Sequence, residues 1–154
     1  MEPRLELHRA SPKAYASMLA MSEAVGQCGL EKNLQELVKI RASQMNGCAF
    51  CLNMHAQAAR RLGESSDRLM LVAAWRDTNA FTPRERAALA WTEALTALGD
   101  GVTDTLYADT REQFSEEEIT NLTLAVAHIN AWNRFGVAFQ LIPPVSANVA
   151  ADEE

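Results

Sequence analysis

The chain has 154 residues, of which 48% are hydrophobic and 22% are charged, as is usual for one globular domain. Its formal net charge of −6 argues against the basic surface that nonspecific nucleic-acid binding requires, so we expect no nucleic-acid partner. The N-terminal residues MEPRLELHRASPK lack the apolar segment of a secretory signal, and no run of apolar residues is long enough to predict a membrane span. With only three cysteines, two of them in a C-x-x-C, we expect a cytoplasmic protein.

The first part of the chain is predicted to form two helices. We expect residues 1–10 to be a flexible lead-in. A Ser-Pro pair then supplies an N-cap and a proline at the first helical position, which predicts a helix over residues 11–25. A break bounded by glycines separates it from a second predicted helix over residues 31–45. The residues expected in the core from this second helix are Leu34, Leu37, Val38 and Met45.

The next predicted helix covers residues 48–62, between an Asn-Gly turn signal and a glycine stop. Cys48, Cys51 and His55 lie at positions i, i+3 and i+7, so a helix places all three on one face. Glu36 precedes Cys48 by twelve residues and lies on the preceding helix. A tight turn between the two helices would fold Glu36 back over the cysteines.

Further helices are predicted over residues 67–78, 83–98, 104–110 and 116–142, and two of them follow capping boxes. Their expected core residues include Leu69, Leu71, Val72, Trp75, Ala88, Trp91, Leu95 and Leu98. The last helix is apolar on two faces, one of which carries His128, so it must be sandwiched in the core or against another subunit. We expect His128 to be a packed histidine rather than a catalyst.

The predicted fold class is all-α, because no alternating pattern of β-branched residues indicates a strand. We expect a single helical domain over residues 11–142, with about six to seven helices. Two prolines should end the last helix, and residues 143–154 should form a mobile acidic tail.

Two thiols beside a histidine and a carboxylate predict redox chemistry. A thiol attacks as its thiolate, which a helix N-terminus, an imidazole or a second thiol each favours. Two cysteines three residues apart can also close a disulfide. The helix terminus favours Cys48 as the thiol of lower pKa, whereas the one-turn spacing to His55 favours Cys51. Glu36 would hold His55 in one tautomer or act as the next proton acceptor.

Three other interpretations use the same residues. Two thiolates and one imidazole are three zinc ligands, and Glu36 or Cys28 would be the fourth, although no second ligand pair of the usual spacing occurs. The cysteines also fit a buried structural cluster, because free cysteine is a common core residue. A chance C-x-x-C match is made less plausible by the added His55 and Glu36. Spacing alone leaves these interpretations open beside redox chemistry.

The segment LQELVKIRASQMNGCAFCLNMHAQAARRLGE resembles the core of the AhpD-like alkylhydroperoxidases, within the carboxymuconolactone decarboxylase superfamily. The family pattern is a glutamate, eleven residues, C-x-x-C, three residues and a histidine, and the matching residues are Glu36, Cys48, Cys51 and His55. The segments AAWRDTNAFTPRERAALAWTEALT and AHINAWNRFGVAF resemble later helices of the family, so the resemblance covers roughly residues 30–140. Better-studied members carry a histidine between the cysteines, where this chain has Ala49 and Phe50.

The resemblance implies an AhpD-like helical fold and a thiol-dependent peroxidase. It implies that Cys51 attacks the hydroperoxide, that Cys48 resolves the product to a disulfide, and that His55 and Glu36 relay the proton. It also implies a homo-oligomer, either a trimer or a hexamer. No organic cofactor motif occurs, so we expect an external thiol or protein reductant and neither a cofactor nor a metal.

Two other functions remain open at this point. A lactone decarboxylase of the same superfamily would need an acid/base site and no thiol pair, so the intact C-x-x-C argues against it. A non-enzymatic metal-binding or redox-sensing module would use the same cysteines without a substrate.

Overall fold

The computed structural model describes residues 2–99 and 101–144, which contain helices and no strand. In chain order the helices are α1 (Leu7–Ala10), α2 (Pro12–Gly26), α3 (Lys32–Asn46), α4 (Ala49–Arg61), α5 (Ser66–Leu71), the 3₁₀ helix η1 (Val72–Asp77), α6 (Pro83–Ala97), α7 (Asp104–Gln113) and α8 (Glu116–Ala138). The all-α fold class is therefore confirmed. None of these helices offers the continuous apolar length that a membrane span needs.

The described residues hold more helices than the six to seven predicted, for two reasons. The short α1 lies inside the predicted lead-in. The single helix predicted over residues 67–78 is instead α5 followed by the 3₁₀ helix η1, and within η1 the backbone of Ala74 leaves helical geometry at φ −120° and ψ 30°.

Local capping signals explain where the helices begin. The Ser11 hydroxyl accepts a hydrogen bond from the Ala14 backbone N–H at the start of α2. The two predicted capping boxes, which open α6 and α8, both form, with the N-cap side chain and the third helical residue bonding reciprocally. The sequence therefore determines these starts without help from tertiary packing.

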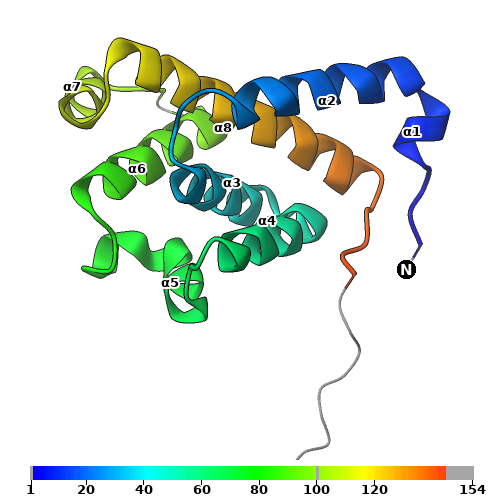
Figure 1. The fold of residues 1–154 in the computed structure, drawn as a ribbon, viewed down its shortest axis with the longest axis horizontal. Coiled ribbons are helices and arrows are strands. Elements are labelled where there is room, and N and C mark those ends of the chain that lie inside the picture. Colours follow the sequence, from blue (N-terminus) through cyan, green and yellow to red (C-terminus); the bar gives the residue numbers. More distant parts are fainter. Residues whose placement is uncertain (1, 100, 145–154) are drawn as a thin grey trace, which may run out of the picture.

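α3 lies at the centre of the fold, packed against α4, α6 and α8 (Figure 1). Leu37 and Ile40 point into an apolar cluster shared with α4, η1 and α6. Leu34 and Val38 point into a second cluster, shared with α6 and α8. α8 crosses the far side of α3 and lies beside α2 (Figure 1). Because α3 is covered on several sides, a polar side chain on it can be buried among other helices.

Three residues expected in the core are instead exposed. Met45, Leu71 and Leu98 have exposed fractions of 36%, 39% and 69%. Met45 is the penultimate residue of α3, and Leu98 is the C-cap of α6. Leu71 is the last residue of α5, where the chain passes into η1, and Val72 and Trp75 of η1 are buried instead.

The last helix ends earlier than predicted, at Ala138 rather than at the prolines. Gln140 adopts a left-handed conformation with φ 53°, and the Leu141 N–H donates to the Gly136 carbonyl at 3.0 Å. This is the hydrogen-bond pattern of a Schellman motif, which satisfies the final carbonyls of the helix. A local capping motif therefore stops α8 before any proline is reached.

The segment before α1 contacts the end of α8. The Arg4 backbone N–H donates to the Phe139 carbonyl at 2.9 Å, and its guanidinium donates to the Ala138 carbonyl at 2.9 Å. This part of the lead-in is therefore tied to the end of α8. Of the tail predicted to be mobile, residues 145–154 lie outside the described residues.

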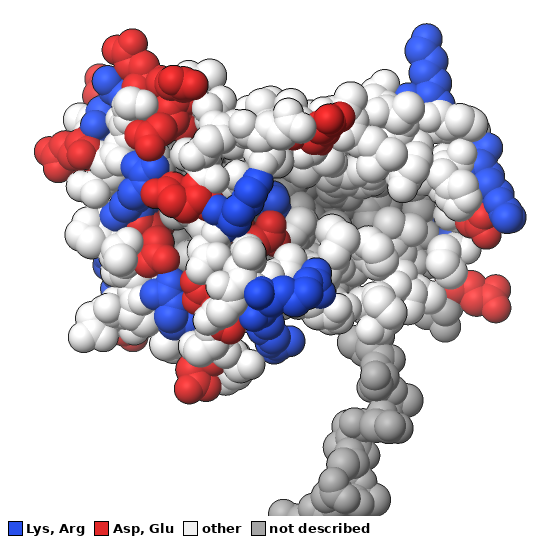
Figure 2. Space-filling model, viewed as in Figure 1, with Lys and Arg blue, Asp and Glu red and all other residues white. Residues whose placement is uncertain are grey.

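Charged side chains gather on the half of the surface that α5, α6 and α7 form (Figure 2). The other half of the same view, where α2 and the end of α8 lie, is largely uncharged and is hollowed beside the charged half (Figures 1 and 2).

Candidate redox site

The turn between α3 and α4 places Cys48 at the start of α4. Gly47 is left-handed with φ 66°, and its N–H donates to the Gln44 carbonyl at 3.3 Å. The Cys48 N–H donates to the Ser43 carbonyl at 3.1 Å, which completes a Schellman motif. Cys48 then acts as the N-cap of α4. The Asn-Gly turn predicted from the sequence is thus confirmed.

Cys48 and Cys51 are joined as a disulfide, with their Cα atoms 5.4 Å apart. The Cys51 backbone N–H also donates to the Cys48 sulfur at 3.3 Å, as an N-cap interaction. Both cysteines are almost fully buried, with exposed fractions of 2% and 3%. The C-x-x-C therefore forms a sheltered sulfur pair at a helix N-terminus.

Gly136 of α8 lies directly over the disulfide. A Cβ atom at this position would be 2.5 Å from the Cys48 sulfur and 3.3 Å from the Cys51 sulfur. Only glycine allows α8 to approach the sulfurs this closely. Gly136 was not among the residues selected from the sequence. A glycine inside a predicted helix could have indicated a close contact with another part of the chain.

A buried amide fixes α8 against the cysteine turn. Asn133 is fully buried, and its side-chain NH₂ donates to the Ser43 hydroxyl at 3.0 Å. Its carbonyl oxygen accepts from the Asn46 side chain at 3.0 Å, and Asn46 also donates to the Asn130 carbonyl oxygen at 2.9 Å. Because a buried amide without partners is costly, this network fixes the position of α8, and so of Gly136, over the sulfurs.

Glu36 of α3 and His55 of α4 lie together, as the sequence predicted. His55 Nδ1 is 2.7 Å from Glu36 Oε2, and both residues are buried. Lys39 Nζ donates to the other carboxylate oxygen, Oε1, at 2.8 Å. Lys39 was not among the residues selected from the sequence, where its only signal was a position one turn after Glu36.

The Glu36 carboxyl group stays ionised in this environment. Burial acts to raise its pKa, but the hydrogen bond from His55 and the positive charges of His55 and Lys39 outweigh burial and hold the pKa below its usual value. An ionised carboxylate only accepts hydrogen bonds, so Nδ1 of His55 carries the proton of this contact. The other ring nitrogen, Nε2, is then left to exchange a proton when His55 is neutral.

His55 follows Cys51 by one turn of α4, so the imidazole and the thiol share a helix face. Within the described residues, no hydrogen bond joins His55 to either sulfur. The site thus consists of the thiol pair and His55 on α4, and of Glu36 and Lys39 on α3. His55 is hydrogen-bonded to Glu36, and Glu36 to Lys39.

Cys28 and Glu93 lie in other parts of the fold. Cys28 packs against the apolar cluster of α3, α6 and α8, and its sulfur accepts from the Gln35 side chain at 3.8 Å. Glu93 accepts from Arg41 at 2.7 Å and from the Trp75 indole at 2.8 Å. No group of three His, Cys, Asp or Glu side chains arranged to hold a metal ion occurs in residues 2–99 and 101–144.

His128 is packed in the core, as expected, at the contact between α8 and α2. Its Nε2 lies 2.8 Å from the Ser22 hydroxyl and accepts from the Trp132 indole N–H at 3.0 Å. Burial, and then the positive charges of Lys39 and His55, lower its pKa to about 4, although the Glu36 carboxylate acts in the opposite direction. His128 is therefore neutral near neutral pH.

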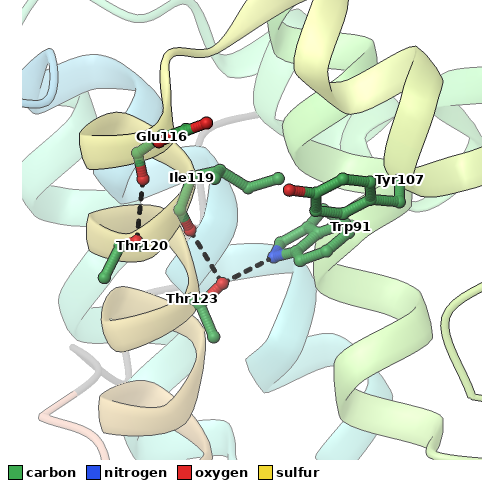
Figure 3. A pocket seen from close by; sticks show the side chains of 6 residues that line it. All are labelled: Trp91, Tyr107, Glu116, Ile119, Thr120 and Thr123. Carbon is green, nitrogen blue, oxygen red and sulfur yellow. Dashed lines mark hydrogen bonds between the residues drawn. The ribbon is translucent and has the colours of Figure 1, made fainter.

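A separate cavity of about 250 Å³ lies between α6, α7 and α8 (Figure 3). The Trp91 indole N–H donates to the Thr123 hydroxyl at 3.0 Å along one side of it (Figure 3). The lining residues are Trp91, Tyr107, Glu116, Ile119, Thr120 and Thr123. None of them belongs to the thiol and carboxylate cluster, so this cavity is distinct from the redox site.

Comparison with known proteins identifies related chains. The model of the carboxymuconolactone decarboxylase family matches residues 12–94. The uncharacterized protein YdfG of Bacillus subtilis is 37% identical over 139 residues, which is 90% of this chain and 95% of YdfG. The alkyl hydroperoxide reductase AhpD of Rhizorhabdus wittichii is 35% identical over 69 residues, which is 44% of this chain and 40% of that protein.

A solved structure is similar over nearly the whole chain. It is a protein of unknown function from Agrobacterium tumefaciens, whose name compares it with the antioxidant defence protein AhpD. The two chains are 38% identical with a TM-score of 0.92, over 94% of this chain and 100% of the other.

Proposed function

Because the chain belongs to the carboxymuconolactone decarboxylase family, we propose that it is an AhpD-like, thiol-dependent peroxidase that reduces hydroperoxides. The observation that carries this proposal is the buried Cys48–Cys51 disulfide, with His55 one turn after Cys51 and hydrogen-bonded to Glu36. The similarity to an alkyl hydroperoxide reductase AhpD supports it. A dithiol supplies the two electrons that reduce a peroxide, and an imidazole bonded to a carboxylate can transfer the proton.

The first step oxidises Cys51. Its thiolate attacks one peroxide oxygen, so that an S–O bond forms and the O–O bond breaks. Cys51 becomes a sulfenic acid, and the hydroperoxide leaves as its alcohol after taking up a proton. His55 is the group that exchanges this proton, since it lies one helical turn from Cys51 and its other nitrogen is bonded to Glu36.

The second step closes the disulfide. The Cys48 thiolate attacks the sulfenic sulfur of Cys51, an S–S bond forms, and the oxygen leaves as water. Across both steps the peroxide gains two electrons and the dithiol loses two. An external thiol or a dithiol protein returns the two electrons and restores the thiols by disulfide exchange.

The position of Glu36 supports a role as the partner of His55 rather than as a base acting alone. Its lowered pKa keeps it ionised, and it fixes the tautomer in which His55 Nδ1 carries the proton.

His55 is the acid/base group of this arrangement, and removing such a group typically slows the reaction by about 100-fold or more. We therefore expect His55→Gln to slow the oxidation of Cys51 by about this factor.

The test is a thiol count on fully reduced, metal-free protein before and after one equivalent of an organic hydroperoxide, followed by peptide mass mapping. We expect two thiols to disappear and a Cys48–Cys51 disulfide to form. Cys28→Ser is the matched control, because its thiol lies in a different cluster, and it should lose the same two thiols.

Single cysteine variants assign the two roles. Cys51→Ser should lose no thiol to oxidation, whereas Cys48→Ser should stop at a sulfenic acid on Cys51 that a dimedone-type reagent captures. The reverse result would exchange the roles of the two cysteines. If all thiols of the wild-type protein survive the hydroperoxide, the proposed function is wrong at its first step.

A further inference from the structure

Lys39 is a partly buried cation beside the carboxylate of the redox site. Its Nζ lies 2.8 Å from Glu36 Oε1, and the side chains of both residues are only 11% exposed. The other two lysines of the chain, Lys13 and Lys32, are exposed. Burying a lysine ammonium is costly unless it is paired, and an exposed helix pair of this spacing would add little stability. A lysine in this position therefore suggests a role connected to the chemistry of Glu36.

The Glu36 carboxylate is shared between two nitrogens. Oε1 accepts from Lys39, and Oε2 accepts from His55 at 2.7 Å. With a neutral imidazole, the charges of Glu36 and Lys39 cancel. Protonation of His55 then adds one uncompensated positive charge to a buried cluster, which is unfavourable. Without the Lys39 ammonium, the same protonation would create a neutral imidazolium–carboxylate pair, which would hold the proton more tightly.

The pKa values of Glu36 and His128 are shifted by charged groups on α3 and α4. The titratable and charged groups that act on the cluster are Lys39 beside Glu36 on α3, His55 on α4 and His128 on α8. The pKa of His128 is lowered to about 4, so it is neutral, and the charge of Lys39 contributes to that lowering. The charge that acts on the Glu36–His55 pair near neutral pH is therefore that of Lys39.

We propose that Lys39 is a positioning residue whose charge keeps the Glu36–His55 pair as a carboxylate and a neutral imidazole. Its ammonium also occupies Oε1, so that Oε2 alone remains for His55. One part of this inference rests on the proposed function, namely that the neutral His55 accepts a proton from Cys51. The charge state of the pair is a property of the folded protein, whatever the substrate.

The test follows the proton uptake of the pair by NMR of the His55 ring in reduced protein, across a pH titration. The three histidine signals are assigned with single His→Gln variants. Removing the unit charge that shares the Glu36 carboxylate with the ring should raise the midpoint of proton uptake by about one pH unit, which is about a tenfold change in proton affinity. We expect this rise in Lys39→Met and in Lys39→Gln, because both lack the charge.

Two variants serve as controls. Lys39→Arg keeps the charge and should titrate close to wild type, which separates charge from chain length. Lys13→Met removes an exposed lysine on α2 and should leave the titration unchanged. Lys39→Gln keeps a hydrogen-bond donor beside Oε1, so it provides a folded variant without the charge if Lys39→Met is unstable.

An unchanged midpoint in Lys39→Gln would overturn the proposal, as would an equal rise in Lys39→Arg. The same reduced samples are then mixed with an organic hydroperoxide. If wild-type protein does not react, the proposed function fails, while the NMR titration still decides the role of Lys39. If wild type reacts but the midpoint does not depend on Lys39, only the present inference fails.

Discussion

Substitution of Gly136 by alanine tests whether α8 packs directly on the disulfide. Gly136 lies within α8, where alanine is intrinsically better than glycine by up to about 1 kcal/mol. Helix propensity alone therefore predicts that the variant is more stable. The added Cβ, however, would be 2.5 Å from the Cys48 sulfur, which is closer than atoms can pack, and 3.3 Å from the Cys51 sulfur, which is a tight contact.

The opposing contributions give a net magnitude. Forcing a methyl group into a well-packed site costs about 1–3 kcal/mol, because side chains and backbone must shift. The hydrogen bonds of buried Asn133 resist a movement of α8 away from the cysteines. After subtraction of a propensity gain of about 1 kcal/mol, we expect Gly136→Ala to lower the free energy of unfolding by up to about 2 kcal/mol. For a chain of this size that corresponds to a fall in Tm of up to about 6 °C.

The measurement is urea unfolding of oxidised protein followed by tryptophan fluorescence, at one fixed protein concentration. Gly26→Ala is the matched control, because Gly26 is the last residue of α2 and a Cβ there meets no atom within 4 Å. This control should be unchanged or slightly more stable. If Gly136→Ala is as stable as Gly26→Ala, α8 does not lie against the sulfurs as described.

Two further predictions concern pH. Burial acts to raise the pKa of Glu93, but hydrogen bonds from Trp75, Arg76 and Arg41 outweigh it and lower the pKa below 4.5. Glu93→Gln should therefore cost about 1–3 kcal/mol near neutral pH, and the difference from wild type should shrink as pH falls below 4.5 through the folded-state pKa; a constant difference in urea unfolding would contradict this. His128 has its pKa lowered from 6.5 to about 4, so the unfolded chain binds its proton first and stability falls between these pH values. His128→Gln should remove up to about 3 kcal/mol of that fall, and an unfolding series with the same pH slope as wild type would refute it.

Much of the redox site was predictable because its parts are close in sequence. Cys48, Cys51 and His55 share one helix, so helical spacing alone puts them on one face. Glu36 joins them through the Schellman turn at Gly47, whose Asn-Gly signal is also local. The roles of the two cysteines and the oligomeric state stay predictions, because neither follows from the fold of one chain.

Local signals failed where a helix meets its partners. Apolar periodicity placed Met45, Leu71 and Leu98 in the core, yet each lies at the end of its helix and is exposed. Periodicity identifies a face of a helix but not how far along that face a neighbour extends.

The sequence by itself determined the all-α fold class, the capping boxes that begin α6 and α8, and the thiol pair with its histidine, because these depend on interactions within a few residues. Only the tertiary structure decided that Gly136 covers the sulfurs, that Asn133 fixes α8 over them, and that Lys39 shares the carboxylate of Glu36 inside a closed cluster. The first two of these link α8 to residues about 90 positions earlier, and the low exposure of the Lys39 side chain depends on how neighbouring helices pack around α3. No local periodicity encodes such contacts, which arise when helices distant in sequence exclude water from the same space.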